Sequence, residues 1–188
     1  LRAFCRSLGP KALVIVDEAY NELTDDPESD TMVDLVREGE NVLVTRTFSK
    51  IFGMAGMRVG YGMARPDIIS NTFKHIMAWP NGVGLTAAYH SYIDQDFINF
   101  SRDKVREGRA MVQKTLADVG LTPVPSQTNF VFVDAGRDAM TIRRAMAEEG
   151  VLINAGYEGY SHYLRISMGK LEDLNTFDRV FKRVMVRV

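Results

Sequence analysis

Apolar residues along the chain form runs and periodic patterns that predict strands and helices. Two continuous apolar runs, residues 12–20 and 41–48, are typical of strands buried on both faces, and a third strand is expected over residues 57–64. A short amphipathic helix over residues 30–39 separates the first two strands. Strands that alternate with helices, without hairpin signals, predict a parallel or mixed α/β sheet.

Beyond Pro66 the pattern becomes mainly helical and then mixed. Helical spacing covers residues 66–79, 85–95 and 96–120, and the last of these is long enough to link two domains. The rest of the chain predicts a strand, a helix, two strands and a helix, over residues 129–135, 138–150, 151–154, 163–168 and 171–188. This order is typical of a compact α+β unit.

These patterns predict an uneven domain organisation. A partial sheet domain is expected over residues 1–95, a linking helix over 96–120 and a complete small α+β domain over 121–188. Three strands are few for a buried α/β sheet, and the chain opens without Met or a signal peptide. We therefore expect part of the first domain, and with it any targeting signal, to lie upstream of residue 1.

Composition excludes several classes of protein. The chain of 188 residues is 46% hydrophobic and 25% charged with a net charge of −1, and it has no basic run typical of nucleic-acid binding. No apolar run approaches the roughly 20 residues of a membrane helix. One cysteine and three histidines without metal-like spacing indicate neither a disulfide framework nor a metal site. We expect no nucleic-acid, membrane or metal partner.

The segment TRTFSKIFGMAGMRVGYG, residues 45–62, carries the first candidate site. Lys50 follows a predicted strand, so it lies at the carboxyl end of the sheet, where open α/β folds place their sites. A partly desolvated lysine there is a usable nucleophile for a Schiff base. The hydroxyls of Thr47 and Ser49 and the guanidinium of Arg58 are suited to a phosphate. The alternative interpretation is an exposed loop lysine.

Two further places hold candidate residues. Asp17 ends an apolar strand, where a carboxylate is costly unless paired or functional, and Tyr20 follows it. Asp17 can hold a protonated heterocyclic nitrogen, although a helix cap, with Tyr20 at the core edge, is an equal alternative. Arg165 lies inside an apolar strand and indicates an anionic partner, either a substrate carboxylate or a structural acid.

The order of these motifs is more specific than any one of them. VDEAYNEL, TFSKIFGMAGMRVGYGMA, PSQTNFVFV and YLRISMG follow one another along the chain. Together they resemble the pyridoxal-phosphate-dependent aminotransferases of fold type I, classes I and II, and in particular the histidinol-phosphate aminotransferase branch. The resemblance covers nearly the whole chain. It implies an α/β fold: the C-terminal part of a three-layer α/β/α major domain, followed by a complete small α+β domain.

The resemblance also implies roles for the candidate residues. Lys50 would carry pyridoxal 5'-phosphate as a Schiff base and move the proton between the substrate and the cofactor. Asp17 would pair with the pyridine nitrogen, and Tyr20 would hydrogen-bond the phenolic oxygen of the ring.

Five other residues would bind the cofactor phosphate and the substrate. By the same resemblance, Thr47, Ser49 and Arg58 would bind the 5'-phosphate. Arg165 would clamp the substrate carboxylate, and Asn129 would lie near the substrate on the small domain.

Two departures from the family pattern affect the site. The family's N-terminal half supplies a phosphate loop, a stacking aromatic, an asparagine and a tyrosine from the partner subunit, and none of these is in this chain. We therefore expect the chain alone to bind the cofactor weakly or not at all and to be inactive. The histidinol-phosphate branch usually has a second arginine where this chain has Asn154. This departure favours an ordinary amino acid over a phosphorylated substrate.

The resemblance predicts a cytoplasmic homodimer that transfers an amino group between an amino acid, or histidinol phosphate, and a 2-oxo acid. One alternative on the same scaffold is a pyridoxal-phosphate-dependent decarboxylase of amino-acid phosphates. A serine–lysine hydrolase built on TFSK is disfavoured, because the position that needs serine holds Thr47. A last alternative is a catalytically incomplete unit with a structural or dimerisation role.

Overall fold

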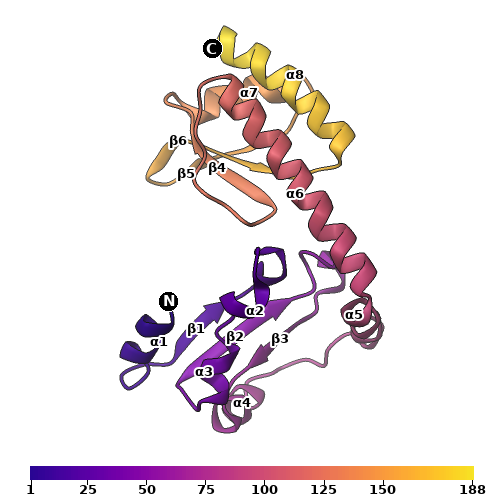
Figure 1. The fold of residues 1–188 in the computed structure, drawn as a ribbon. Coiled ribbons are helices and arrows are strands. Elements are labelled where there is room, and N and C mark those ends of the chain that lie inside the picture. The colour runs from indigo at the N-terminus through magenta and orange to yellow at the C-terminus, as the bar shows by residue number, and fades with distance from the viewer. The chain divides into compact units, whose positions relative to one another are not determined.

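The computed structural model describes all residues from Leu1 to Val188. The chain divides into two compact units, residues 1–101 and 102–188, and each has its own three-stranded sheet (Figure 1). Helix α6, Gln95–Asp118, contains the boundary between the units. No helix has both the length and the apolar content that crossing a membrane requires.

The sheet of the first unit carries strands β1 (Val14–Asp17), β2 (Val42–Thr47) and β3 (Gly60–Met63) in that order. Strand β1 pairs with β2 in parallel and β2 with β3 antiparallel, so the prediction of a parallel or mixed sheet is confirmed as mixed. Because β1 and β2 are parallel, their carboxyl ends, where Asp17 and Thr47 lie, meet at one edge of the sheet.

The other elements of this unit are short. They are helices α1 (Arg2–Leu8), α2 (Pro27–Asp30), α3 (Val33–Arg37), α4 (Pro66–Phe73) and α5 (Gly82–Ile93), with 3₁₀ turns η1 (Asn21–Leu23) and η2 (Ala55–Met57). One apolar cluster joins α1 and α3 to the sheet. It consists of Cys5, Val16, Met32, Leu35, Val42 and Val44. Burial of this apolar surface stabilises one face of the sheet against the helices.

The prediction that β1 is buried on both faces is wrong for this chain. Val16 faces the helices and is buried, but Ile15 faces the opposite way and is 63% exposed. Side chains alternate across a strand, and helices α1 and α3 pack on only one of the two faces. The continuous apolar run therefore correctly indicated a strand, but not how much of it is covered.

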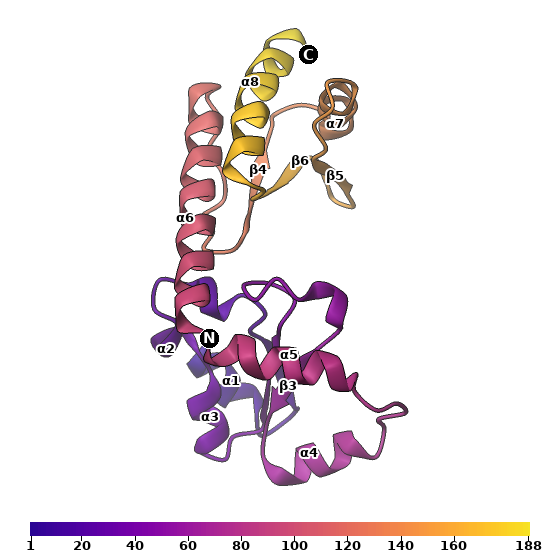
Figure 2. The ribbon, with the colours of Figure 1, turned by 90° about the vertical axis from the view of Figure 1, so that its right-hand side faces the viewer.

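The second unit is an antiparallel sheet backed by helices. Strands β4 (Phe130–Asp134), β5 (Asn154–Tyr157) and β6 (Tyr160–Ser167) lie in the order β4-β6-β5. Helices α7 (Ala139–Glu148) and α8 (Leu171–Arg187) and the end of α6 supply the rest of its core. Figure 2 shows α8 running beside α6, where the Thr115 hydroxyl donates to Asp178 at 2.7 Å.

Two predicted elements differ from the structure in their bounds. The helix expected over 66–79 ends at Phe73, and the side chains beyond it find little to pack on: Met77 is fully exposed and Trp79 is 97% exposed. The strand expected over 151–154 begins only at Asn154. The residues before Asn154 belong to the turn that ends α7, since the Val151 N–H bonds to the Met146 carbonyl. A helix, α6, does cover most of residues 96–120, but its role as a separate link between two domains stays a prediction.

Gly60 allows β3 to approach β2 closely. A Cβ placed on Gly60 would lie 2.8 Å from the Arg46 carbonyl oxygen, a backbone atom that cannot rotate away. We expect Gly60→Ala to lower the free energy of unfolding by about 1–3 kcal/mol, as overpacking typically does. Urea unfolding of the 188-residue chain measures this change.

Gly56→Ala is the matched control for this prediction. Nothing lies within 4 Å of a Cβ placed at Gly56, and neither glycine has a positive φ. The control is expected to change stability by less than about 0.5 kcal/mol. Equal effects of the two substitutions would show that the close approach does not matter.

Candidate active site

Asp17 is the last residue of β1 and lies on the open face of the sheet. Its Oδ1 accepts hydrogen bonds from the Ala19 N–H at 3.1 Å and from the Thr45 hydroxyl at 3.4 Å. Thr45 is its partner in the register of the parallel strands. The second carboxylate oxygen takes part in neither bond, so an exposed acceptor remains at the carboxyl end of the strand.

Lys50 lies just beyond β2, in a loop that buried apolar residues hold in place. Phe48, Ile51, Phe52 and Val59 are all buried, and the Phe48 and Phe52 rings lie 4.8 Å apart between centroids. The Phe48 N–H bonds to the Val59 carbonyl at 3.1 Å, which closes the loop. Anchored on both sides of the lysine, the loop has little freedom to move it.

The Lys50 ammonium lies over the ring of Tyr20. Its Nζ is 5.1 Å from the ring centroid, within the range of a cation–π contact. Tyr20 comes from the turn after β1, and Lys50 from the turn after β2. The structure therefore brings Asp17, Tyr20 and Lys50 to one edge of the sheet, from two strands that are neighbours in space.

The three residues expected to hold phosphate lie at the end of β2 and in the segment that connects it to β3. The Thr47 hydroxyl accepts the Ser49 N–H at 3.1 Å, which bends the chain at the end of β2. Arg58 has φ 55° and ψ 46° and is the only residue other than glycine with a positive φ. Backbone strain of this kind, of the order of 1–3 kcal/mol, is concentrated at functional sites. Its exposed guanidinium donates to the Ala55 carbonyl at 2.7 Å.

Arg165 and Asn129 both lie in the second unit. Arg165 is central in β6, and its guanidinium carbon is 4.0 Å from the centroid of the Phe130 ring. Asn129 immediately precedes Phe130, and its carbonyl accepts the Met168 N–H at 2.8 Å. Across the sheet, Arg165 pairs in register with Asn154 of β5. This cation–π contact with Phe130 limits the movement of the guanidinium and so helps to orient its N–H donors.

A cavity of about 310 Å³ adjoins Arg165 within this unit. Polar residues that line it include Asn154, Arg165, Ser167, Asp173 and Thr176. The cavity is thus large enough for a small polar group, and one cation and one carboxylate face it.

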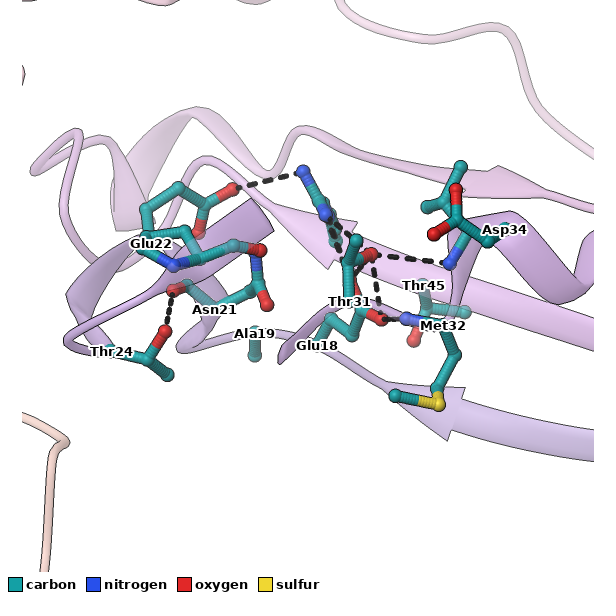
Figure 3. A network of polar contacts seen from close by, with 12 residues as sticks. Glu18, Ala19, Asn21, Glu22, Thr24, Thr31, Met32, Asp34 and Thr45 are labelled. Carbon is teal, nitrogen blue, oxygen red and sulfur yellow. Dashed lines mark hydrogen bonds and ion pairs between the residues drawn. The ribbon is translucent and has the colours of Figure 1, made fainter. Parts of the chain in front are cut away.

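A buried polar network behind the strand ends was missed by the sequence analysis (Figure 3). Arg46 donates from Nε and Nη2 to one oxygen of Glu18, at 3.0 and 2.8 Å. Glu18 also accepts the Thr31 hydroxyl and the Met32 N–H, and Arg46 donates to the Thr31 oxygen at 2.9 Å. Glu18 is only 7% exposed and Thr31 only 9%.

The guanidinium of Arg46 and the carboxylate of Glu18 stabilise each other's charge. Burial disfavours the charged form of Arg46, but the hydrogen bond and charge of Glu18 outweigh burial and raise the pKa of Arg46. Removing one partner of such a pair typically costs about 3–5 kcal/mol, because it leaves the other charge buried and unpaired. Two signals in the sequence could have indicated the pair: an arginine within an apolar strand and an acid next to Asp17.

The predicted site residues therefore form two groups. The first unit brings together Asp17, Tyr20, Thr47, Ser49, Lys50 and Arg58 around the ends of β1 and β2. The second unit contains Asn129 and Arg165, on strand segments that are paired with each other.

Known proteins resemble this chain over almost all of its length. It is 36% identical over 187 residues to a histidinol-phosphate aminotransferase from Symbiobacterium thermophilum, which matches 98% of this chain and 51% of that protein. A histidinol-phosphate aminotransferase from Anaeromyxobacter is 39% identical over 173 residues, which is 90% of this chain and 47% of that protein. The chain spans about half the length of the relatives that it matches.

Solved structures have the same fold. A histidinol-phosphate aminotransferase from Sinorhizobium meliloti, in complex with pyridoxal-5'-phosphate, matches 99% of this chain and 52% of its own, with a TM-score of 0.88 and 30% identity. The L-threonine-O-3-phosphate decarboxylase from Porphyromonas gingivalis matches 98% of this chain and 58% of its own, with a TM-score of 0.82. At 19% identity the decarboxylase shows the fold alone.

A family model decides the membership. The model described as aminotransferase class I and II matches residues 1–180. This match includes both groups of candidate residues, and the predicted family and fold class are confirmed. The chain belongs to the class I and II aminotransferases.

Proposed function

We propose that the complete protein is a pyridoxal-phosphate-dependent aminotransferase. It would move an amino group between an amino acid, or histidinol phosphate, and a 2-oxo acid. The observation that carries this proposal is the position of the Lys50 amine, 5.1 Å from the centroid of the Tyr20 ring, where Asp17 ends the adjoining parallel strand. Membership of the class I and II family supports the proposal.

Three side chains of the first unit match three groups of pyridoxal phosphate. The amine of Lys50 suits its aldehyde, the carboxylate of Asp17 its ring nitrogen, and the guanidinium of Arg58 its phosphate. When bound, the cofactor supplies an electron sink that stabilises negative charge on the substrate Cα.

Lys50 and Asp17 would then have separate tasks. The Lys50 Nζ would hold the cofactor through its aldehyde carbon and would carry the proton removed from the substrate Cα. The open oxygen of Asp17 would accept the ring N–H and keep that nitrogen protonated. Tyr20, which contacts Lys50, would direct its hydroxyl toward the phenolic oxygen.

The end of β2 would hold the phosphate. The hydroxyls of Thr47 and Ser49 and the fork of Arg58 supply neutral and charged donors from one short segment. The left-handed backbone of Arg58 supports this role, because residues in strained conformations are concentrated at ligand-binding sites.

The second unit would hold the substrate. Arg165 would bind the substrate carboxylate through two N–H groups, and Asn129 would lie beside it. The cation–π contact of Arg165 with Phe130 supports this role, since an oriented fork loses less freedom when it binds.

Asn154 bears on the class of substrate. Its register partner is Arg165, so a second arginine at this position would place two guanidinium groups on neighbouring strands. Asparagine provides no such charge, which favours an amino acid without a phosphate group over histidinol phosphate. Decarboxylation of an amino-acid phosphate remains the alternative, and release of carbon dioxide instead of a 2-oxo acid distinguishes it.

We also infer that groups outside these 188 residues complete the pocket. Asp17 and Arg58 are both exposed, so their charges are screened by water in this chain. Large exposed apolar side chains near α4 and α5, such as Met77 and Trp79, support a homodimer.

Reductive labelling tests the proposed function. Pyridoxal phosphate is added to the complete protein, the Schiff base is fixed with borohydride, and the modified peptide is mapped. We expect one cofactor per chain, attached to Lys50. Modification at another lysine in place of Lys50, or none, would contradict the proposal.

The 188-residue chain provides a second measurement. We expect weak labelling of its Lys50, because only part of the pocket is present. Stoichiometric binding with high affinity would show that this chain holds the cofactor without further groups. Lys50→Arg keeps the positive charge but forms no Schiff base under these conditions, so it is the control for labelling elsewhere.

A further inference from the structure

Two pairs of residues occupy opposite faces at the ends of β1 and β2. Asp17 and Thr45 are partners in register, and their side chains meet on the open face. The next residues along both strands, Glu18 and Arg46, point to the covered face, because side chains alternate across a strand. The Glu18 N–H bonds to the Thr45 carbonyl at 2.8 Å, so the two pairs share one stretch of backbone.

Arg46 contacts both ends of the turn that carries Tyr20. Its Nη2 binds Glu18 at 2.8 Å, and its Nη1 lies 3.8 Å from Glu22. Glu18 precedes the turn residue Tyr20 and Glu22 follows it. One guanidinium therefore holds both ends of the turn from the covered face of the sheet.

The same arginine lies just before the lysine loop. Arg46 is followed by Thr47, the last residue of β2, and the loop with Lys50 begins there. A shift of Arg46 would move the start of this loop and the Tyr20 turn together. The position of Lys50 relative to Asp17 thus depends on a contact that neither residue makes.

The restraint behind the sheet is firmer than the one on its open face. Asp17 is held by only two hydrogen bonds, of which the one from Thr45 is long, at 3.4 Å. Glu18 accepts from Arg46, Thr31 and the Met32 N–H, and it is almost fully buried. Buried charge pairs with every group satisfied resist displacement, because each lost bond leaves a charge unpaired.

We propose that Glu18 and Arg46, joined by the Thr31 hydroxyl, are positioning residues that fix Asp17 and Tyr20 relative to Lys50. This inference rests on the proposed function of those three residues. The pair lies on the covered face, opposite Asp17, and would act through the backbone that the two strand ends share.

The test compares variants of the complete protein by labelling at Lys50. Arg46→Met removes the guanidinium and keeps a long side chain, and Glu18→Gln removes only the charge. We expect the concentration of pyridoxal phosphate for half-maximal borohydride labelling of Lys50 to rise by about 10- to 100-fold, the range known for groups that orient metal ligands from behind. Labelling of exposed Lys11, at cofactor concentrations well above those that saturate Lys50 in the unmodified protein, reports any general change in reactivity.

A variant at the other end of the strand separates positioning from stability. Val42→Ala leaves a cavity in the same covered face, but Val42 is at the start of β2, far along the strand from Arg46. All variants are compared at temperatures where circular dichroism shows each to be folded. We expect Val42→Ala to lower the melting temperature without changing the labelling curve at Lys50.

Thr31→Val is a milder variant that keeps the test possible if Arg46→Met or Glu18→Gln does not fold. It removes one hydroxyl from the network and keeps the shape of the side chain, and it is expected to shift the Lys50 curve in the same direction. Arg46→Lys retains the charge without the fork and is expected to restore labelling only in part.

The outcomes are distinct. Unchanged labelling in folded Arg46→Met and Thr31→Val overturns the positioning role, and so does an equal shift in Val42→Ala. Absence of Lys50 labelling in the unmodified protein would instead refute the proposed function. A shift confined to the network variants supports the inference.

Discussion

Replacing Lys50 by alanine is expected to abolish amino transfer by the complete protein. The substitution removes both the amine that bonds the cofactor and the base that moves the substrate proton. Proton transfer by a positioned side chain alone contributes about 10²–10⁴-fold to a rate, so we expect kcat to fall by at least about 10³-fold. Steady-state transfer to a 2-oxo acid, measured with the amino donor preferred by the unmodified protein, checks this expectation.

The fold should survive this substitution. Lys50 makes no ion pair, and the loop around it is held by Phe48, Phe52 and their buried neighbours. We expect a change in stability within about 0.5 kcal/mol. Lys11→Ala, at an exposed position before β1, is the matched control and should leave kcat unchanged. A Lys50→Ala protein with more than a tenth of the normal kcat would contradict the assigned role.

Asp17→Asn is expected to have the second largest effect. Asparagine keeps an oxygen for the Ala19 N–H and the Thr45 hydroxyl, so the turn should stay intact. It cannot, however, hold a positive charge on the ring nitrogen. Loss of one partner of a hydrogen-bonded charge pair costs about 2–5 kcal/mol, so we expect kcat to fall by roughly 10²-fold or more.

Two variants show whether charge is the cause. Asp17→Glu keeps the charge and displaces it, and it should retain more activity than Asp17→Asn. Asp103→Asn removes an exposed carboxylate from α6 and should leave kcat unchanged. If Asp17→Asn retained normal kcat, Asp17 would be only the cap of the turn at Ala19.

Much of the fold followed from local patterns. The strands around Val16, Val44 and Val131 and the long helix before Gly120 are set by residues close together in sequence, and their types were predicted correctly. Prediction was less accurate where a local pattern continued beyond its packing partners. The helical spacing after Phe73 had no surface to cover, and Ile153 turned into the core before its strand began.

The candidate residues were also visible in the sequence. Lys50 and Asp17 each follow or end an apolar strand, and the ends of parallel strands in an open sheet must meet at one edge. Each residue taken alone also fitted a structural role. Their order along the chain gave the family, because independent motifs rarely fall in the same succession.

The sequence by itself thus determined the strands, the family and the residues that carry the proposed chemistry. Only the tertiary structure decided which charges meet. Glu18 and Arg46 lie 28 positions apart, and their pairing depends on the register of β1 against β2 and on the packing of Thr31 over both. A one-residue shift of that register would turn Arg46 to the open face, since side chains alternate. Local sequence patterns set the strands, but the long-range pairing of β1 with β2 decided which side chains meet at the strand ends.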